Sequence, residues 1–506
     1  MSIVKSFLEK GILISPEVIK DPLLLEKLSQ IDDELLEQDV VIDKAFLSKA
    51  GLLSEPSSLG EDASKEATKE TSNIKVLFSY NKPPGKISVN DFVVYFNKRF
   101  EALTSFLRQR KELQSVISIS RVKTKRNSKD RVTTAGLVFD KSLTKTGKIV
   151  IKLEDTTGII PVIVSDKYKE AYDMAKDLVL DEAIGVEGVC FSDALFANKI
   201  FIPDIPLTKE LKKGPKEEYL ALIGDPHFGS KKFLKKEFED FIKWLNQEKG
   251  SPEQKEIASK VKYIIIIGDL VEGVGVYPNQ EKDLEIKDIR EQYKQFAEYL
   301  EQIPKHITIF ACPGNHDAGR IAEPQPPLLH DFTKALQQIP NLMLLSSPSM
   351  INIGATKDFL GFDILLYHGY SLIYYSDHVE SIRSSGGQKR PDLIMKFLLQ
   401  KRHLAPTHTS NRYVPDADAD PLIINKIPDF FITGHIHRVS VSNYKNVTLI
   451  NASCWTGITE DQEKRGLENQ PAKVPIINLK TREVKVINFL KSESEKPRPE
   501  ESPKII

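Results

Sequence analysis

The sequence predicts an α/β protein in which a small helical region and a small β-barrel precede a larger domain built on buried strands. Three observations predict this class. Apolar runs typical of buried strands recur between residues 219 and 433, and each is followed by a short polar motif. Short strand signals separated by turns occupy residues 116–202. Leucine-rich helical signals fill residues 1–53.

Residues 1–53 are expected to form a helical module. Ser15 before Pro16 and Asp21 before Pro22 each place a capping side chain ahead of a proline at the first helical position. Residues 54–73 hold a single large apolar side chain among many charges, and we expect a disordered linker there. Residues 491–506 are rich in charge and proline and are expected to be a disordered tail.

Residues 74–210 are predicted to form an OB-fold β-barrel. An amphipathic helix over 91–103 precedes strand signals at 116–119, 134–139, 148–153, 159–164, 183–189 and 199–202. Thr157-Gly158 is expected to form a hairpin turn. Five or six short strands with this spacing are typical of a small closed barrel. Such barrels bind nucleic acid or serve purely as protein docking surfaces, and we give the two alternatives equal weight.

Residues 211–490 are predicted to form the larger α/β domain. Its buried strands are expected at 219–223, 263–267, 307–311, 362–367 and 430–433. The polar motifs that follow these strands contain, in order, Asp225 and His227, then Asp269, then Asn315, His316 and Asp317, then His368, and finally His435 and His437. Catalytic groups in open α/β sheets collect at the carboxyl ends of the strands. The motifs therefore predict an active site at that edge.

The residue types in these motifs predict a site for two metal ions. Imidazole nitrogens, carboxylates and one amide oxygen suit a first-row divalent ion such as Mn, Fe or Zn better than they suit Mg or Ca alone, because Mg and Ca favour all-oxygen ligands. Two such ions can hold a phosphate, activate water and stabilise an in-line displacement. Asp269 stands alone after its strand and is the candidate for a carboxylate shared by both ions. Asp225 and His227 are two residues apart, so they can grip one ion together.

Composition restricts the remaining possibilities. The 506 residues carry 71 Lys plus Arg and 71 Asp plus Glu, so no global basic charge indicates nucleic-acid binding. Three cysteines, Cys190, Cys312 and Cys454, are expected to be buried thiols of a reducing compartment. No apolar run is long enough to span a bilayer, and we expect a soluble cytoplasmic protein. The five histidines outside the motifs are expected to lie on the surface or in loops.

A basic run between Arg108 and Arg131 is a candidate DNA-binding segment. Nine basic residues occur there against Glu112 and Asp130. Such a run is usually a solvated face. Next to a barrel and a two-metal site that can hold a phosphate, however, it could bind DNA phosphates. The candidate DNA-binding residues are Arg121, Lys123, Lys125 and Arg126.

The ordered motifs D-x-H, GD, GNHD, H and GHxH resemble those of the calcineurin-like metallophosphoesterases, whose fold is a two-sheet α/β sandwich. The resemblance implies one metal held by Asp225, His227, Asp269 and His437. It implies a second metal held by Asp269, Asn315, His368 and His435. His316 would contact the phosphate and protonate the leaving oxygen, and Asp317 would orient His316.

Longer phrases, including residues 268–280, 312–318 and 401–406, are similar to those of the small subunits of archaeal family-D DNA polymerases. This resemblance implies a 3′-5′ proofreading exonuclease that acts on single-stranded and primer-template DNA. Manganese would be the first choice of ion, with Fe, Zn or Mg as other possibilities. The large catalytic subunit would be the heterodimer partner and would dock on the barrel and the nearby phosphoesterase surface. A sliding clamp is a further candidate partner.

Two alternatives remain open. The chain could be a catalytically silent structural subunit with an inherited metal site. It could also be a phosphomonoesterase or a cyclic-nucleotide diesterase, which the five motifs alone would allow.

Overall fold

A computed structural model describes residues 13–14, 41–42, 73–83, 85–125, 130–458, 463 and 468–490. The chain divides into two units, Met1–Thr71 and Ser72–Ile506. In the first unit, β1 (Leu13–Ile14) pairs in parallel with β2 (Val41–Ile42). Apart from these four residues and Asn73, the predicted helical module 1–53, the linker 54–73 and the tail 491–506 lie outside the described residues.

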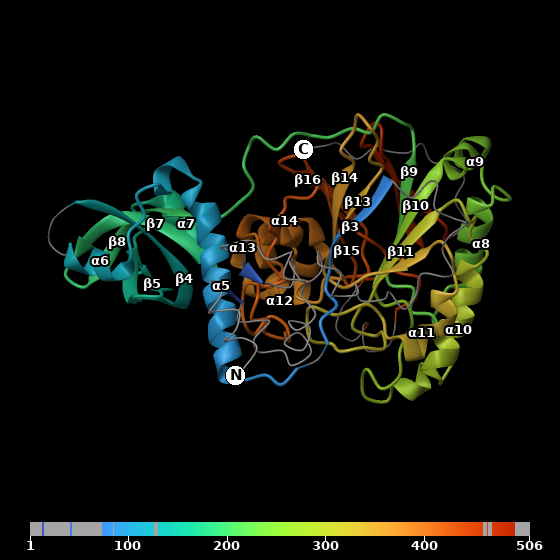
Figure 1. The fold of residues 1–506 in the computed structure, drawn as a ribbon, viewed down its shortest axis with the longest axis horizontal. Helices are drawn as coiled ribbons and strands as arrows, with labels where there is room; N and C mark the ends of the chain where they lie inside the picture. The colour runs from blue at the N-terminus through green and yellow to red at the C-terminus, as the bar shows by residue number, and fades with distance from the viewer. Residues whose placement is uncertain are drawn as a thin grey trace. The chain divides into compact units, whose positions relative to one another are not determined.

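The second unit contains a five-stranded closed barrel with the strand order β4-β5-β6-β8-β7 (Figure 1). Its strands are β4 (Arg131–Leu143), β5 (Ile149–Asp155), β6 (Gly158–Val164), β7 (Ala183–Phe191) and β8 (Ala194–Phe201), with α7 (Lys169–Lys176) after β6. Alternate residues such as Ile151, Leu153 and Val162 are buried inside it. Asp155 pairs with Gly158, so the predicted hairpin is confirmed with its turn one residue earlier than expected.

Two parts of the predicted barrel domain fold differently. Val116–Ser118 form no strand, because the short apolar run ends where helix α6 (Ile119–Thr124) begins. Strand β3 (Ile74–Ser79) is not a barrel strand and pairs antiparallel with β13 (Ser349–Ile353). The predicted helix is confirmed as α5 (Val89–Arg108), which packs on the barrel through Leu103.

Two six-stranded sheets form the rest of the second unit. The first has the order β12-β11-β10-β9-β18-β19 and the second β16-β17-β15-β14-β13-β3. The strands of the first sheet are β9 (Tyr219–Ile223), β10 (Val261–Ile267), β11 (Thr308–Cys312), β12 (Leu342–Leu344), β18 (Lys473–Asn478) and β19 (Val484–Asn488). Those of the second, besides β3 and β13, are β14 (Phe362–Leu366), β15 (Phe430–Thr433), β16 (Ser440–Tyr444) and β17 (Val447–Asn451).

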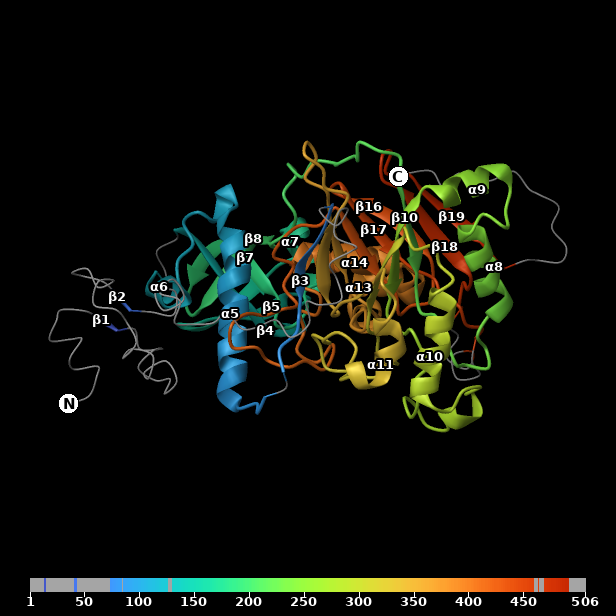
Figure 2. The same ribbon diagram turned by 45° about the vertical axis from the view of Figure 1, so that its right-hand side comes forward.

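The inner strands, such as β9, β14 and β15, are buried on both faces because hydrophobic clusters lie on both sides of each sheet, whereas the edge strands β3, β16 and β19 are partly exposed. Leu222 and Ile265 of the first sheet share one cluster with Ile364 and Phe430 of the second. The outer face of the first sheet packs on α8 (Lys235–Leu245), α9 (Pro252–Ser259), α10 (Ile289–Leu300) and α11 (His330–Gln337). The outer face of the second packs on α12 (Leu372–His378), α13 (Glu380–Ser384) and α14 (Pro391–Lys401). Figure 1 shows these two helical groups on opposite sides of the paired sheets, and Figure 2 shows α8 and α9 beside β18 and β19 of the first sheet.

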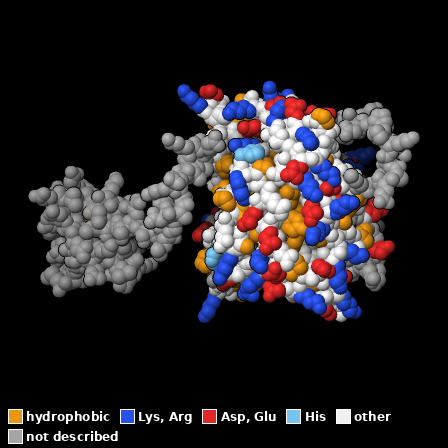
Figure 3. Space-filling model, turned by 90° about the vertical axis from the view of Figure 1, so that its right-hand side faces the viewer, with side chains coloured by type: hydrophobic (Ala, Val, Ile, Leu, Met, Phe, Trp, Pro, Cys, Tyr) orange, Lys and Arg blue, Asp and Glu red, His pale blue; other side chains and the backbone are white. Residues whose placement is uncertain are grey.

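The expected burial of the three cysteines is confirmed. Cys190, Cys312 and Cys454 are buried cysteines. Trp244 and Trp455 are each 1% exposed and belong to one hydrophobic cluster. The outer face of α8, α9 and α10 carries acidic and basic side chains in alternation, so it offers no continuous basic track (Figure 3). Among the described helices, none combines the length and the apolar character needed to cross a bilayer.

Candidate metal centre

The five polar motifs meet because their strands run side by side with the same direction. Strands β9, β10 and β11 are parallel neighbours in the first sheet, and β14 and β15 are parallel neighbours in the second. Backbone hydrogen bonds join the segments beyond the strand ends: the His227 amide donates to the Asp269 carbonyl at 2.9 Å, and the Gly434 amide donates to the His368 carbonyl at 2.9 Å. The polar motifs therefore lie together at the carboxyl ends of the strands, as the sequence predicted.

Asp225, His227 and His437 form the first group of possible metal ligands. The Nε2 atoms of His227 and His437 are 3.0 Å apart, and His437 Nε2 lies 3.6 Å from Asp225 Oδ1. Ligand atoms that surround one tetrahedral ion at about 2.1 Å lie about 3.4 Å from one another. The donor atoms of this group therefore fit a single first-row divalent ion.

Asp269, His368 and His435 form the second group. Asn315 belongs with them, because its Oδ1 lies 3.0 Å from His368 Nε2. The other nitrogen of His368, Nδ1, lies 3.0 Å from the Ile267 carbonyl oxygen and donates to it, so Nε2 is the nitrogen left for an ion.

Asp269 stands between the two groups. Its Oδ2 lies 3.7 Å from His227 Nε2 and 3.4 Å from His368 Nε2. Its Oδ1 accepts a hydrogen bond of 2.8 Å from the His316 amide, which fixes the carboxylate in this orientation. A single oxygen can thus face both groups, as a carboxylate shared by two ions must.

The backbone at the site is held in a conformation that non-glycine residues rarely adopt. Asp225, His227, Asp269, His435 and His437 have φ between 43° and 66°. This left-handed conformation costs on the order of 1 kcal/mol or more per residue and persists only where the surrounding structure fixes it. Five of the seven predicted ligands share it, so the fold stabilises a strained constellation at this one place.

Two glycines leave room for the ligand carboxylates. A Cβ atom on Gly314 would lie 2.2 Å from Asp269 Oδ1, and one on Gly434 would lie 2.6 Å from Asp225 Oδ2. The glycines that open the GN and GH motifs are therefore required by contact with the ligands of other strands.

Charges at the site stabilise one another. Burial works against ionisation of Asp269, yet the imidazoles of His368, His316 and His227 hold the pKa of its carboxyl well below the ordinary value. Burial also disfavours a proton on His368, but Asp269 and Asp225 raise its pKa to about 10. The pocket thus pairs anionic oxygens with imidazoles from both sheets.

His316 has a different orienting partner from the predicted one. Its Nδ1 lies 2.8 Å from the carbonyl oxygen of Glu272, so Nδ1 carries the proton and Nε2 is left free. Asp317 does not contact this ring. Its carboxylate accepts hydrogen bonds from the Gly314 amide at 2.9 Å, the Leu270 amide at 3.1 Å and the Tyr293 hydroxyl at 2.8 Å. Asp317 therefore fastens the loop that carries His316, and burial raises its pKa to about 7.

Glu272 is a site residue that the sequence analysis missed. Its Oε2 lies 3.0 Å from His227 Nδ1, and its side chain is buried. The residue falls within residues 268–280, one of the phrases that carry the resemblance to the small subunits of archaeal family-D DNA polymerases. This similarity was the one sequence signal that could have pointed to Glu272 as a site residue.

The DNA-binding candidates lie apart from this centre. Arg121, Lys123 and Lys125 are exposed on or next to α6, and within the described residues none of them has an ion-pair partner. Arg126 lies outside the described residues. No described contact joins these cations to the strand-end ligands.

His403 does not lie on the surface as expected. It is fully buried, and its Nε2 lies 2.8 Å from Asp420 Oδ2.

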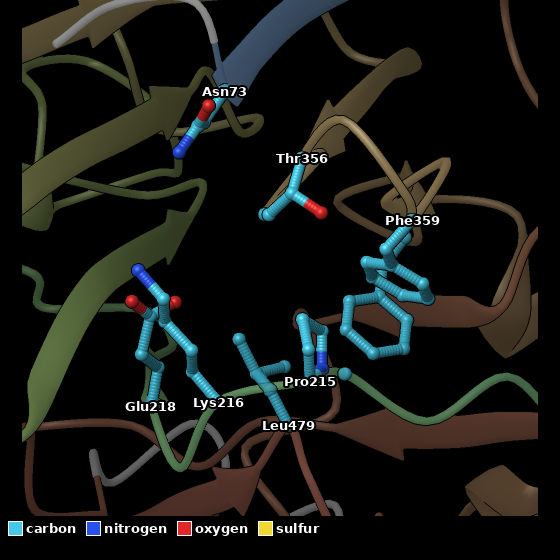
Figure 4. A pocket seen from close by; sticks show the side chains of 10 residues that line it. Asn73, Pro215, Lys216, Glu218, Thr356, Phe359 and Leu479 are labelled. Carbon is cyan, nitrogen blue, oxygen red and sulfur yellow. The ribbon is translucent and has the colours of Figure 1, made fainter.

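A small pocket opens near the other end of β9, away from the strand-end ligands. Lys216, Glu218, Asn73 and Thr356 are among the side chains around it (Figure 4). Its volume of about 20 Å³ has room for roughly one water molecule. It cannot hold a nucleotide.

Comparison with known proteins gives the family. The family of the B subunits of DNA polymerases alpha and epsilon matches residues 220–441. A DNA polymerase II small subunit of Methanothermobacter thermautotrophicus is 34% identical over 94% of this chain and 97% of its own length. One from Methanocaldococcus jannaschii is 39% identical over 78% of this chain and 64% of its own.

Likeness to solved structures is weaker. An archaeal phosphodiesterase matches 53% of this chain and 98% of its own with 14% identity and a TM-score of 0.27, which supports no argument about function. The sequence relatives, of which the first is matched over nearly its whole length, confirm the resemblance stated from the motifs. The chain belongs to the family of archaeal DNA polymerase II small subunits.

Proposed function

We propose that this small subunit is a metal-dependent 3′-5′ exonuclease that removes mismatched nucleotides from a primer end. The observation that carries the proposal is the place of Asp269, whose Oδ2 lies 3.7 Å from His227 Nε2 of the first ligand group and 3.4 Å from His368 Nε2 of the second. A small subunit that only supported its partner would have no need for five strained ligand residues with matched donor atoms.

The two ions would be held by residues from both sheets. Asp225, His227, Asp269 and His437 would bind the first, and Asp269, Asn315, His368 and His435 the second. Manganese is the first choice, with Fe, Zn or Mg as other possibilities, since imidazole and carboxylate donors suit these ions. When bound, such a pair would activate water and neutralise charge on the phosphate.

His316 would supply the proton for the leaving group. With its Nδ1 proton donated to the Glu272 carbonyl, the protonated ring would present Nε2–H to the substrate. Cleavage of the terminal phosphodiester breaks the bond between phosphorus and the 3′-oxygen, and that oxygen would take the proton from Nε2. Asp317 would act through the loop and not through the ring.

The barrel would guide DNA or dock the partner. Its strand order, with a helix between the third and fourth strands, supports an OB-fold assignment. The exposed cations Arg121, Lys123 and Lys125 would contact the phosphates of single-stranded or primer-template DNA, and we assign Arg126 the same role. A small polymerase subunit implies a large catalytic subunit as partner, and the barrel with the nearby phosphoesterase surface would dock it. A sliding clamp would be a further contact.

The test is cleavage of 5′-labelled single-stranded DNA by the purified chain with Mn²⁺, alone and with the large subunit. We expect a ladder that shortens from the 3′ end. His316→Ala should reduce the cleavage rate by about 10²–10⁴-fold while metal binding is retained. Asp269→Ala should abolish cleavage and metal binding together. His306→Ala, which changes an exposed histidine, is the control.

Two results would contradict the proposal. Absence of cleavage even with the large subunit would favour a structural subunit. Turnover of nucleotide monoesters without cleavage of DNA would favour a phosphomonoesterase.

A further inference from the structure

Glu272 contacts two histidines of the site by two different groups. Its carboxylate Oε2 lies 3.0 Å from Nδ1 of His227, and the Nε2 of that ring faces His437 Nε2 at 3.0 Å. The carboxylate therefore holds His227 by the nitrogen that points away from the first ligand group. The proton on Nδ1 that this contact requires leaves the Nε2 lone pair for an ion.

The main-chain carbonyl of the same residue holds His316. Its oxygen accepts the Nδ1–H of His316 at 2.8 Å, and Gln280 Nε2 donates to that oxygen at 2.9 Å. The rings of His227 and His316 lie edge to face with their centroids 4.6 Å apart. One residue thus sets the tautomer and direction of two neighbouring imidazoles with different tasks.

Glu272 is itself fixed on several sides. Its amide donates to the Phe228 carbonyl at 2.9 Å. Its Oε1 accepts from the Tyr277 hydroxyl at 3.2 Å and from Gln280 Nε2 at 3.3 Å. The next residue is Gly273, where φ is +75° and a Cβ would lie 2.2 Å from the His316 carbonyl oxygen. The side chain is 3% exposed, so water does not compete for these contacts.

We propose that Glu272 is a positioning residue that couples the first metal site to the acid of the reaction: its carboxylate sets His227 for metal binding and its carbonyl sets His316 for proton donation. The inference rests on the proposed nuclease function and assigns to Glu272 the orienting role that the sequence had given to Asp317. It also gives a function to the phrase 268–280, whose Tyr277 and Gln280 hold Glu272 in place.

The carboxylate route is tested by Mn²⁺ titration calorimetry. Removing a carboxylate that orients a metal-ligand histidine typically changes metal affinity or activity by about 10–100-fold. We expect Glu272→Gln, which keeps the size of the side chain, to weaken Mn²⁺ binding by about tenfold and Glu272→Ala to weaken it further. The matched control is Glu182→Gln, another buried glutamate, which contacts Lys401 and not the site. Affinity unchanged within about twofold in Glu272→Gln would overturn this route.

The carbonyl route is tested by Gln280→Leu, assayed at saturating Mn²⁺. This change removes the 2.9 Å donor to the carbonyl that His316 uses, together with the longer 3.3 Å bond to Glu272 Oε1. The Mn²⁺ affinity of the variant therefore reports any movement of the Glu272 carboxylate. We expect kcat to fall about tenfold with KM and Mn²⁺ affinity within about threefold of the wild type. An unchanged kcat would overturn this route.

The two proposals fail separately. Mn²⁺ titration needs no turnover, so a wild-type chain that binds the ion but cleaves no DNA would refute the nuclease while Glu272→Gln still decides the carboxylate route.

Discussion

Two buried clusters of charged side chains can be compared. At the strand ends, the carboxylates of Asp225 and Asp269 face imidazole nitrogens. Where helix α5 meets the segment 403–420, the single carboxylate of Asp420 faces an arginine. In the second place, which we call the junction cluster (Tyr95, Arg99, His403 and Asp420), Arg99 Nε donates to Asp420 Oδ2 at 2.7 Å. Tyr95 and His403 also donate to Asp420, at 2.7 and 2.8 Å. Both clusters are buried and both are polar.

The clusters differ in whether the chain completes them. Arg99 Nη1 donates to the Pro406 carbonyl, and the Ala405 amide donates to His403 Nδ1, so each group of the junction cluster has a partner within the protein. At the strand ends, the Nε2 atoms of His227 and His437 lie 3.0 Å apart, a distance that suits a hydrogen bond between the rings or two ligands of one ion. The backbone is left-handed at five of the seven predicted ligands, while none of the four junction residues has a positive φ. A buried polar cluster that satisfies itself stabilises the fold, and one that does not is prepared for a ligand.

The largest effect should come from filling the space beside a ligand. Gly434→Ala would place a Cβ 2.6 Å from Asp225 Oδ2, so the carboxylate or the GHxH loop must move. We expect cleavage of single-stranded DNA to fall by at least about 100-fold, since small misplacements of catalytic groups have effects of this size. Gly319→Ala is the control, because no heavy atom lies within 4 Å of its Cβ position. Equal loss in both variants would contradict the argument.

The strand-end ligands could be predicted from the sequence because each lies within a few residues of a strand end. An apolar run and the polar residue after it are local features, and parallel strands bring such residues together. The junction cluster could not be predicted in this way, since Arg99 and Asp420 are 321 positions apart. Strand β3 was assigned to the wrong domain for a related reason: six residues of β-type sequence do not specify which sheet they join.

The roles of Glu272 and Asp317 also lay beyond the sequence. Asp317 follows His316 directly, and adjacency suggested an orienting contact. In the structure, the Asp317 carboxylate accepts a hydrogen bond from a backbone amide, and the His316 ring donates to a main-chain carbonyl. A carbonyl carries no residue-specific signal, so this partner required coordinates.

The next effect should be on stability. Arg99→Met would leave Asp420 buried without its cation, and breaking a buried pair in this way typically costs about 3–5 kcal/mol. We expect the urea midpoint of unfolding to fall accordingly, while folded protein keeps its Mn²⁺ affinity. Lys98→Met on the same helix is the control, because Lys98 is exposed and its pair with Glu101 should contribute less than about 1 kcal/mol. A weakened Mn²⁺ affinity in Arg99→Met would show that the clusters are coupled.

The junction cluster should also make stability depend on pH. Burial, aided by the charge of Arg99, lowers the pKa of His403 to about 4, against an ordinary value of 6.5. The unfolded chain therefore binds a proton that the folded chain does not, so this stabilisation is present above pH 6.5 and is lost as pH falls toward 4. The shift corresponds to on the order of 3 kcal/mol.

His403→Gln should remove this dependence. We expect the difference in unfolding free energy between the wild type and the variant to shrink as pH falls from 7 to 4. Titrating groups that do not contact His403 are common to both proteins and cancel in the difference. Asp420 contacts His403, but despite burial Arg99 also holds the pKa of its carboxyl well below the ordinary value, so Asp420 stays ionised over this pH range. Parallel pH profiles would contradict the assignment.

The smallest effect is expected from a change near Asp317, a residue of the site whose hydrogen bonds are all made within the protein. Asp317 resembles the junction cluster, because its three hydrogen bonds all come from the protein, and Tyr293 supplies one of them. Tyr293→Phe removes that donor and also the acceptor of the Ala318 amide, which should cost about 1–3 kcal/mol of stability. The ring keeps its packing, so we expect kcat to change less than about threefold. Tyr172→Phe, which loses one exposed bond to the Gly147 carbonyl, is the control and should cost less than about 1 kcal/mol. If kcat instead falls tenfold at full Mn²⁺ saturation, Asp317 acts on His316 after all. Asp317 would then have to be counted with the groups that take part in the reaction, although its hydrogen bonds are made within the protein.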